Sequence, residues 1–174
     1  MPQIRLTDTL FKIHNIFLLD YLVKPLSPST EVAFFIEKGH VMEVIDLGHK
    51  NIVALFFGPN EFVVKCHPIS KIAALDDVSG NPFTHGQIIN LLRKLPELHH
   101  HYRGIRQKYE EKVAARQASL AMSEKARFEE MVKTQMWVLE LAKPEDIASY
   151  LHISSSLLCE LINNSYKTMR KKHN

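Results

Sequence analysis

The chain has 174 residues, 45% of them hydrophobic, and its lysines and arginines outnumber its acids by only three. This length allows a real hydrophobic core in one domain or two small ones, and the net charge is too small to mark a nucleic-acid binder by itself. The positive charge is uneven, however, and gathers toward the C-terminus. Only Cys66 and Cys159 occur, which argues against a disulfide scaffold, so we expect reduced thiols in a cytoplasmic protein.

An apolar run over residues 16–23 is the first candidate element. Asp20 interrupts the run, and His14 and Asn15 precede it, so it makes a poor signal peptide and is too polar to span a membrane. We therefore expect a buried helix or strand there and no membrane partner.

Residues 31–74 follow the pattern of an antiparallel β unit. Apolar segments of strand length alternate with turn signals that contain glycine, histidine, proline and asparagine. Gly80 and Pro82 are expected to close the strands, and Thr84 is placed to cap a helix over residues 85–95. Nearly all of the sequence after this point has a helical pattern.

A long helix is predicted over residues 97–122, with Pro96 just before it. Its apolar residues are spaced four, three and four apart, which is the spacing of a coiled-coil seam and predicts a homodimer. Lys112 and Arg116 then occupy the strict heptad positions, so a short pairing of helices is expected rather than a long zipper. The predicted dimer residues are Leu98, Tyr102, Ile105 and Tyr109.

A further helix is predicted over residues 123–142, opened by Ser123. The apolar side of that helix carries Phe128, Met131, Val132 and Trp137. Residues 143–164 then have the pattern of two short helices around a tight turn, and Pro144 starts the first of them.

The sequence IASYLHIS within this last segment has the most specific spacing in the chain. Ala148 is small, as is needed where two helices cross closely, and Ser154 can accept hydrogen bonds from free amides at the start of the second helix. With the preceding β unit and long helix, this spacing resembles the CRP/FNR family of transcription regulators over roughly the last two thirds of the chain. The first helix of the family's motif is matched by Ile147, Ala148 and Leu151, the turn by His152 and Ile153, and the cap by Ser154. The family usually has glycine where this chain has His152.

The resemblance implies an α+β fold with three parts. The first is a small antiparallel β-roll, cupin-like and similar to a cyclic-nucleotide-binding domain, which we assign in reduced form to residues 1–83. The second, residues 84–122, contains the dimerisation helix, and the third, residues 123–174, is a helix-turn-helix DNA-binding domain. The implied partners are DNA and a second copy of the chain.

The family's nucleotide site is not preserved. Members that bind cyclic nucleotides hold the ribose with a glutamate after a glycine and hold the phosphate with an arginine. Here Val64 and Lys65 align with the glycine and glutamate, and Ile69 lies near the arginine position. A buried phosphate would have no partner, so we expect no binding of cyclic AMP or cyclic GMP. A different small effector, apolar or anionic, stays an open alternative.

The groove-facing positions of the second helix are polar but short. Ser155 and Glu160 occupy the places of the family's base-reading arginines, which removes the forked contact to guanine and predicts weak or A·T-biased selectivity. Cations beyond this helix suit backbone phosphates, although a lysine-rich C-terminus is also typical of a solvated tail. The predicted DNA-binding residues are Ser154, Ser155, Ser156, Cys159, Glu160, Asn163, Lys167, Arg170, Lys171 and Lys172.

Other chemistry-bearing residues have simpler interpretations. The consecutive histidines at residues 99–101 point about 100° apart on a helix and do not converge on one metal ion. Cys66 and His67 have no second pair at ligand spacing, which favours a core thiol beside a turn histidine. The sequence has no phosphate-cradling glycine loop, nucleophile elbow or HExxH motif. We therefore expect no metal, no cofactor and no enzymatic activity.

Two functions from different classes remain. The favoured one is a cytoplasmic, dimeric, DNA-binding regulator of CRP/FNR type whose roll does not respond to cyclic nucleotides. The alternative is a degenerate relative that has lost specific DNA binding and acts as a protein-interaction module through its roll and paired helices. Binding to duplex DNA distinguishes the two.

Overall fold

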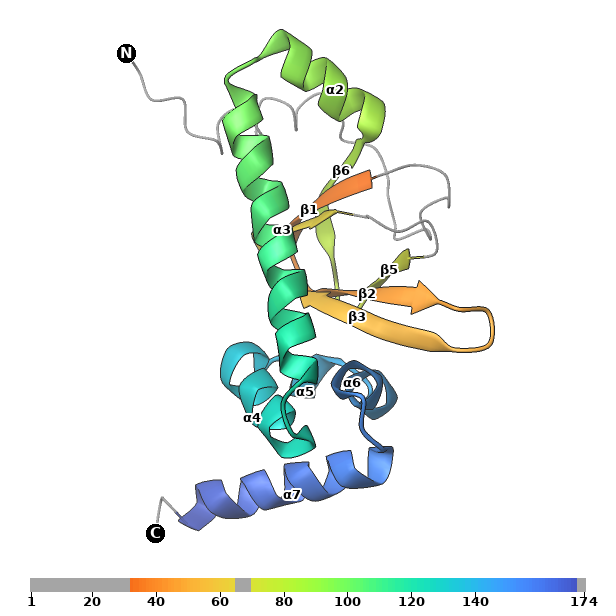
Figure 1. Ribbon diagram of the computed structural model, residues 1–174, viewed down its shortest axis with the longest axis vertical. Coiled ribbons are helices and arrows are strands. Elements are labelled where there is room, and N and C mark those ends of the chain that lie inside the picture. The colour runs from red at the N-terminus through yellow and green to blue at the C-terminus, as the bar shows by residue number, and fades with distance from the viewer. Residues whose placement is uncertain (1–31, 65–69, 172–174) are drawn as a thin grey trace.

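The computed structural model describes residues 32–64 and 70–171, and in this part of the chain strands come first and helices follow (Figure 1). The strands are β1 (Val32–Lys38), β2 (Val41–Asp46), β3 (Asn51–Phe57), β4 (Phe62–Val64), β5 (Ser70–Ala74) and β6 (Ser79–Thr84). The helices are α2 (His85–Lys94), α3 (Leu98–Leu120), α4 (Glu124–Gln135), α5 (Val138–Leu141), α6 (Pro144–Leu151) and α7 (Ser155–Lys171). The predicted α+β class is confirmed. The element expected over residues 16–23 lies outside the described residues.

The strands form two three-stranded sheets, in the orders β4-β1-β6 and β3-β2-β5, with every neighbouring pair antiparallel. We call these two sheets, residues 32–84, the roll. Ile36 and Val63 of the first sheet pack with Val41, Leu55 and Phe57 of the second in one buried cluster. Burial of these side chains, at roughly 1.5–3 kcal/mol each, is what holds the two sheets together.

Gly80 and Pro82 do not end the strands, so that prediction was wrong. Both lie inside β6, where Pro82 is opposite Phe34 of β1. β6 is the outer strand of its sheet, and proline is tolerated at such an edge because it removes no ladder hydrogen bond there. Gly80 is needed because a Cβ at this position would lie 2.1 Å from the carbonyl oxygen of Phe35.

Two helix starts follow the predicted caps. The Gln87 N–H donates to Thr84 Oγ1 at 3.2 Å while the Thr84 N–H donates to Gln87 Oε1 at 2.8 Å, a reciprocal cap that begins α2. Ser123 Oγ accepts from the Ala126 N–H at 3.3 Å and begins α4. The helix predicted over residues 123–142 is divided, however, into α4 and α5, with Trp137 at the division.

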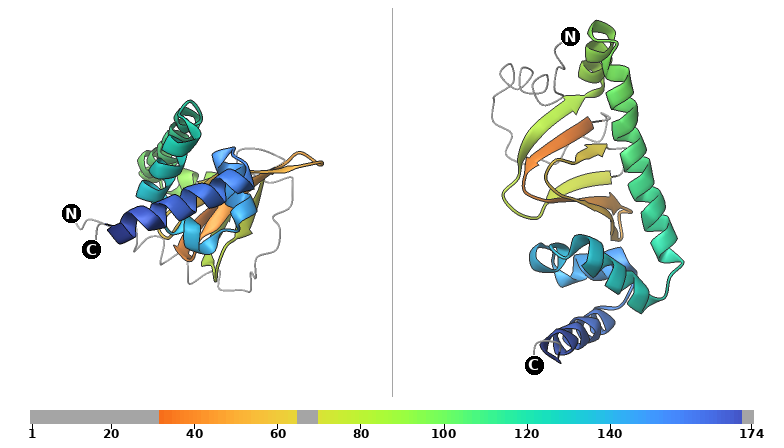
Figure 2. Two further views of the ribbon diagram at one scale, coloured as in Figure 1. Left: turned by 90° about the horizontal axis from the view of Figure 1, so that it is seen from below. Right: turned by 90° about the vertical axis from the view of Figure 1, so that its left-hand side faces the viewer.

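Helix α3 runs along one side of the roll, from α2 at one end of the molecule toward α4 at the other (Figures 1 and 2). Tyr109 Oη donates to Glu43 Oε2 at 3.0 Å, and the Tyr109 ring is parallel to the Phe57 ring, with 6.2 Å between centroids. Lys112 Nζ donates to Glu61 Oε1 at 2.7 Å and lies 4.4 Å from the Phe57 ring centroid. Aromatic packing and ion pairing therefore attach the middle of α3 to the roll.

The C-terminal helices share a second core with the roll. This cluster joins Val44, Val53 and Phe56 of the roll to Phe128, Met131, Val138, Ala142, Ile147, Ala148, Leu151 and Leu158 of α4 to α7. The Val53 N–H also donates to Ser149 Oγ at 3.2 Å, so α6 covers the outer edge of β3. The helical part is thus docked on the roll by apolar and polar contacts together.

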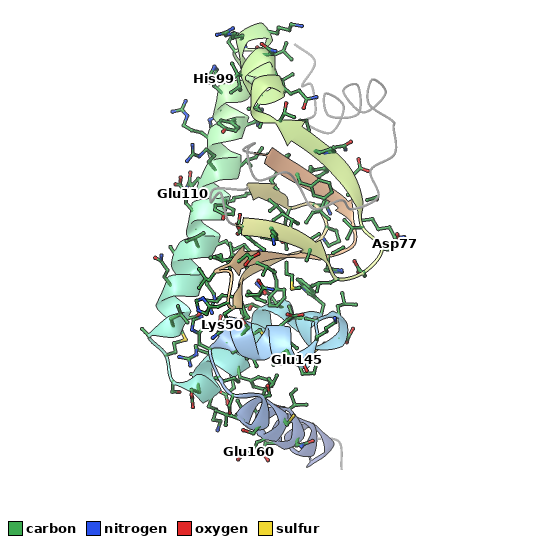
Figure 3. The ribbon with its side chains drawn as sticks, turned by 90° about the vertical axis from the view of Figure 1, so that its right-hand side faces the viewer. Lys50, Asp77, His99, Glu110, Glu145 and Glu160 are labelled. Atoms are coloured by element: carbon green, nitrogen blue, oxygen red, sulfur yellow. The ribbon has the colours of Figure 1, made fainter. Side chains whose placement is uncertain are left out.

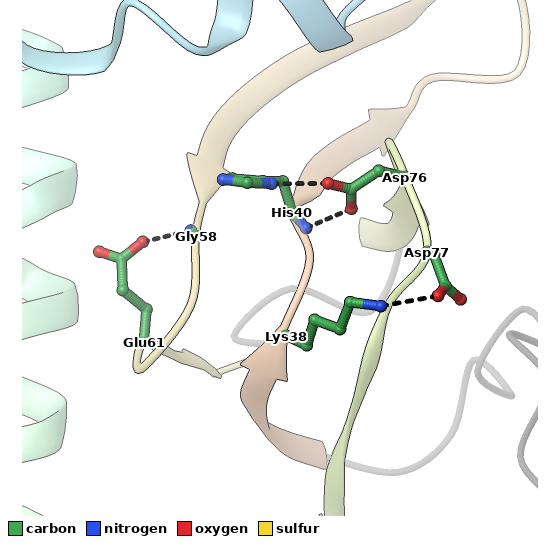
Figure 4. A network of polar contacts seen from close by, with 6 residues as sticks. All are labelled: Lys38, His40, Gly58, Glu61, Asp76 and Asp77. Carbon is green, nitrogen blue, oxygen red and sulfur yellow. Dashed lines mark hydrogen bonds and ion pairs between the residues drawn. The ribbon is translucent and has the colours of Figure 1, made fainter.

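His40, just before β2, is held within the roll by Asp76 (Figure 4) and contacts Trp137 between α4 and α5. Asp76 Oδ1 accepts from the His40 N–H at 2.6 Å, and Asp76 Oδ2 lies 2.8 Å from His40 Nδ1. Burial acts to raise the pKa of Asp76, but the hydrogen bonds from His40 outweigh it and hold the pKa below its usual value. The other side of the ring meets Trp137, at 4.3 Å between centroids.

Candidate nucleic-acid interface

Helices α6 and α7 are joined by a turn of three residues. Pro144 occupies the first turn of α6, and Glu145 and Asp146 carry negative charge there, where the helix dipole favours it. Ala148 is 5% exposed and Leu158, on α7, is fully buried, and both belong to the core cluster that α6 and α7 share. Two helices around a turn lie where the sequence predicted them, but α7 continues to Lys171 and is longer than the short helix expected within residues 143–164.

The turn between them is strained at His152, where the family usually has glycine. His152 has φ 52° and ψ 49°, the left-handed conformation in which glycine is favoured and other residues cost roughly 1–2 kcal/mol. Ser154 then caps α7 as predicted, since Ser154 Oγ accepts from the Leu157 N–H at 3.2 Å. The cap hydroxyl also lies 3.0 Å from Ser156 Oγ.

The predicted groove-facing residues of α7 are all exposed and share its outer surface. This surface consists of Ser155, Ser156, Cys159, Glu160 and Asn163. Glu160 lies on the side of α7 that faces away from the rest of the molecule (Figure 3). No lysine or arginine occurs between residues 154 and 166, so Glu160 is the only formal charge along this part of the helix.

The cations predicted to contact phosphates lie at the end of α7 and beyond it. Lys167, Arg170 and Lys171 belong to the last turns of α7, although their side chains lie outside the described residues. Lys172 lies outside them altogether. Their role therefore stays a prediction.

The predicted dimer residues share one face of α3, the face on which Tyr109 contacts the roll. Leu98, Tyr102, Ile105 and Tyr109 are each half-buried within a single chain. The assignment of Tyr109 to a seam between two copies is not supported by its surroundings, because Phe57 and Glu43 of the same chain already contact it. Spacing along a helix identifies an apolar face but does not tell which neighbour covers it. Dimerisation itself stays a prediction.

The space between the roll and α3 is filled by the chain's own polar and aromatic side chains. Glu43 is 3% exposed and is reached there by the Tyr109 hydroxyl. Of the three residues aligned with the family's nucleotide motif, Lys65 and Ile69 lie outside the described residues, and Val64 ends β4. A cavity of about 320 Å3 lies elsewhere, between the β2–β3 turn and the α6–α7 turn, and includes Lys50 and His152 in its lining.

Two arginines that contact the C-terminal end of α6 were not identified from the sequence. Arg116 of α3 is 9% exposed and donates through Nη2 to the carbonyl oxygen of Tyr150, while its guanidinium carbon lies 4.2 Å from the Tyr150 ring centroid. Arg127 of α4 donates through Nη2 to the carbonyl oxygen of His152 at 3.4 Å. The signal in the sequence was Arg116 itself, an arginine at a heptad position where an apolar residue is expected.

Histidines and cysteines form no recognisable centre in the described part of the chain. His100 and His101 are exposed, with their rings 5.8 Å apart and tilted by 67°. Residues 32–64 and 70–171 hold no cluster of three or more side chains able to bind a metal ion. Cys159 is a free, exposed thiol, and the pair Cys66 and His67 lies outside the described residues. Within the same described ranges, no helix has both the length and the apolar character needed to cross a membrane.

No family model and no curated protein matches the sequence. Solved structures nevertheless share the fold. A cyclic nucleotide-binding domain containing protein from Listeria monocytogenes EGD-e has a TM-score of 0.64 and 13% identity over 93% of this chain and 91% of its own. A CooA mutant from Carboxydothermus hydrogenoformans has a TM-score of 0.64 and 16% identity, over 83% of this chain and 73% of its own. A CRP/FNR family transcriptional regulator from Thermus thermophilus has a TM-score of 0.50 and 15% identity, over 86% of this chain and 82% of its own.

These similarities define the fold of the chain. It is the α+β arrangement of an antiparallel roll, a long helix and further C-terminal helices that is found in cyclic-nucleotide-binding-type proteins and CRP/FNR-type regulators.

Proposed function

We propose that the chain is a dimeric, cytoplasmic, DNA-binding transcription regulator of CRP/FNR type that does not respond to cyclic nucleotides. The observation that carries the proposal is the outer surface of α7. A row of short polar side chains is exposed on a capped helix whose opposite side is buried against α6, and α7 lies at one end of the elongated molecule (Figure 1). A helix presented in this way can enter a major groove.

The chemistry of this surface sets the kind of DNA binding. Serine hydroxyls and the Asn163 amide can bond to base edges, while the Glu160 carboxylate can accept from cytosine but repels phosphate. Affinity must then come from cations at the end of α7 and beyond, which contact phosphates without reading sequence. Binding should accordingly be salt-sensitive and only modestly selective.

The second copy of the chain is proposed to pack on the outward face of α3. Since the opposite face is used by the roll, the available face is the one that carries exposed residues spaced alternately four and three apart. Gly104 has open space around it, so a partner helix can approach closely. The proposed dimer face consists of His100, Gly104, Gln107, Glu111, Ala114 and Ala118.

The absence of a nucleotide response is supported by what fills the roll. Tyr109 and Glu43 bond to each other between the roll and α3, and Lys112 is paired with Glu61. A nucleotide entering there would have to separate these pairs and leave Glu43 facing a phosphate of the same sign. Calorimetric titration with cyclic AMP should detect no saturable binding with a Kd below about 100 μM, which corresponds to a binding free energy of roughly −5.5 kcal/mol.

The test of the regulator is selection from a random duplex library with the full chain at two salt concentrations. The expected result is a two-fold symmetric motif that is enriched weakly and lost as the salt concentration rises. Neutralising Arg170, Lys171 and Lys172 together should weaken binding to all duplexes alike and flatten the salt dependence, by about one unit of slope per lost phosphate contact. Replacing Lys94, Lys125 and Lys133, which are exposed on α2 and α4, gives a control of equal charge loss.

One observation favours the alternative function. Glu160 places a negative charge in the middle of the surface that would meet DNA, and no described cation accompanies it on α7 before residue 166. If the chain binds no duplex even at low salt, the protein-interaction module replaces the regulator.

A further inference from the structure

The C-terminal ends of α3 and α6 converge on two guanidinium groups. Arg127 Nη1 donates to the carbonyl oxygens of Leu120 at 3.2 Å and Met122 at 2.9 Å, at the end of α3. Arg127 Nη2 reaches the His152 carbonyl, and Arg116 donates to the Tyr150 carbonyl, both at the end of α6. The last carbonyls of a helix have no partner within it and carry partial negative charge, so they are natural acceptors for arginine.

These carbonyls take the place of carboxylates. Neither Arg116 nor Arg127 forms an ion pair with any acid in the described residues. Burial lowers the pKa of Arg116; Tyr150 opposes this shift, and the nearby Arg127 charge adds to it. A buried cation without a counter-charge is stable only while its acceptors stay in position. The two arginines therefore fix the helix ends, rather than simply covering them.

Arg116 also ties three elements into one stack. Its guanidinium lies over the Tyr150 ring of α6, and that ring meets the Phe56 ring of β3 edge-on at 4.9 Å between centroids. Nη1 of Arg116 donates to Ser119 Oγ at 3.0 Å, and this bond holds the guanidinium group against α3. The contact thus runs from α3 through α6 to the roll, and α7 begins only a short turn beyond Tyr150.

We propose that Arg116, supported by Arg127, is the positioning residue that sets the direction of α7 relative to α3 and the roll. The consequence for DNA binding rests on the proposed function. Helix α7 has 17 residues and is about 25 Å long, so a small rotation at α6 moves its far end by several ångströms. Two copies must present their α7 helices at the spacing of successive major grooves, which leaves little tolerance for such a rotation.

The direct test measures a distance in the full chain without DNA. Spin labels are placed on the exposed Cys159 of α7 and on Lys108→Cys of α3, in a Cys66→Ser background and diluted with unlabelled protein to suppress distances between copies. The parent should give one narrow distance distribution by pulsed electron spin resonance. Arg116→Met should broaden it, and so should Arg116→Lys, because a lysine keeps the charge but loses the fork and the flat stacking surface.

Matched controls separate positioning from general stability. Tyr150→Phe keeps the ring and the backbone carbonyl and should match the parent. Arg106→Met removes an exposed arginine of the same helix, whose only described partner is Glu110 at 3.6 Å, and should also match it. Duplex affinity should fall about tenfold in both Arg116 variants if the competent orientation drops to about a tenth of the population.

The outcomes separate this inference from the proposed function. Narrow distributions in Arg116→Lys and Arg116→Met, with parental duplex affinity, would overturn the positioning role. If Arg116→Met does not fold, Arg116→Lys decides alone. A parent that binds no duplex removes the regulator, while the distance measurement still decides whether Arg116 directs α7.

Discussion

The hydroxyl of Tyr109 donates a 3.0 Å hydrogen bond to the carboxylate of Glu43, a residue that is only 3% exposed. The bond joins α3 to β2 across a cluster of apolar side chains. The net stabilisation from such a hydrogen bond is small. If the donor is removed, however, the buried carboxylate still carries its full desolvation cost without a partner, and this is what destabilises the fold. This bond can be tested separately from the stacking of Tyr109 on Phe57 and from the Lys112–Glu61 pair.

Tyr109→Phe should lower the free energy of unfolding by about 1–3 kcal/mol, because the ring still packs on Phe57 while Glu43 loses its donor. Denaturant unfolding measures the change. The double variant Tyr109→Phe, Glu43→Met removes both polar partners and should recover most of the loss. A single variant as stable as the parent would mean that Glu43 is not held by Tyr109.

His152→Gly should stabilise the chain by about 1 kcal/mol, since glycine adopts the left-handed turn without the steric cost of a Cβ. The midpoint of thermal unfolding should rise by a few degrees. Asn60 provides the comparison, because it has φ 65° but asparagine already tolerates this region. Asn60→Gly should therefore give a smaller gain, and a larger gain there than at His152 would contradict the strain assigned to the turn.

The stability of the parent should decline as the pH falls through about 6.5. Burial lowers the pKa of His152, and the charges of Arg116, Arg127 and Lys50 lower it further, whereas Glu124 in the same cavity has the opposite sign. The unfolded chain then binds this proton more tightly than the folded one, so protonation favours unfolding below the ordinary histidine value of 6.5. His152→Asn should show a shallower decline between roughly pH 7 and pH 5.5 in chemical unfolding. Equal slopes would remove the role of this histidine.

Glu160→Arg should strengthen binding to duplex DNA and steepen its salt dependence by about one to two units. The change removes a carboxylate that repels phosphate and adds a side chain able to pair with guanine. Glu129→Arg, an exposed change of equal charge on α4, controls for net charge. Fluorescence anisotropy titrations at several salt concentrations provide the measurement. Weaker binding in Glu160→Arg would identify Glu160 as a residue that reads bases and would contradict the repulsion of phosphate assigned to it.

Ala114→Glu should convert the proposed dimer to a monomer in light scattering at micromolar concentration, because it places like charges where two copies of α3 would meet. Arg106→Glu changes charge at an exposed position of the same helix that lies farther from this face, and should leave the mass unchanged. Ile105→Glu should mainly reduce stability, since Ile105 is half-buried against its own chain. If Ile105→Glu dissociates the dimer without lowering stability, the dimer interface is the apolar seam predicted from spacing and not the outward face proposed above.

Local pattern was sufficient for much of the architecture. Alternation and turn residues located the strands before residue 75, Thr84 and Ser123 marked helix starts, and the spacing of Ala148 and Ser154 gave the helix pair. These features depend on neighbours within a few residues, which a sequence displays directly.

The errors have a common physical cause, which is that long-range partners are invisible in one dimension. Pro82 was assigned to a strand end because the sequence does not say which strand lies at a sheet edge. Tyr109 was assigned to a second copy because the partner on β2 lies 66 positions away. Arg116 looked like a fault in a heptad, although it contacts Tyr150, 34 positions later.

The hydrogen bond from Val53 to Ser149 has a consequence for how far this protein is modular. With α6 in place, the outer edge of β3 is covered and Val44, Val53 and Phe56 are buried by helices. Cutting the chain after residue 122 would leave an unpaired strand edge beside an apolar patch, and both features promote pairing with other copies. The helical segment that is proposed to bind DNA therefore also covers surfaces through which the roll would otherwise self-associate. The roll and the helices share one core, so neither is a structurally independent module.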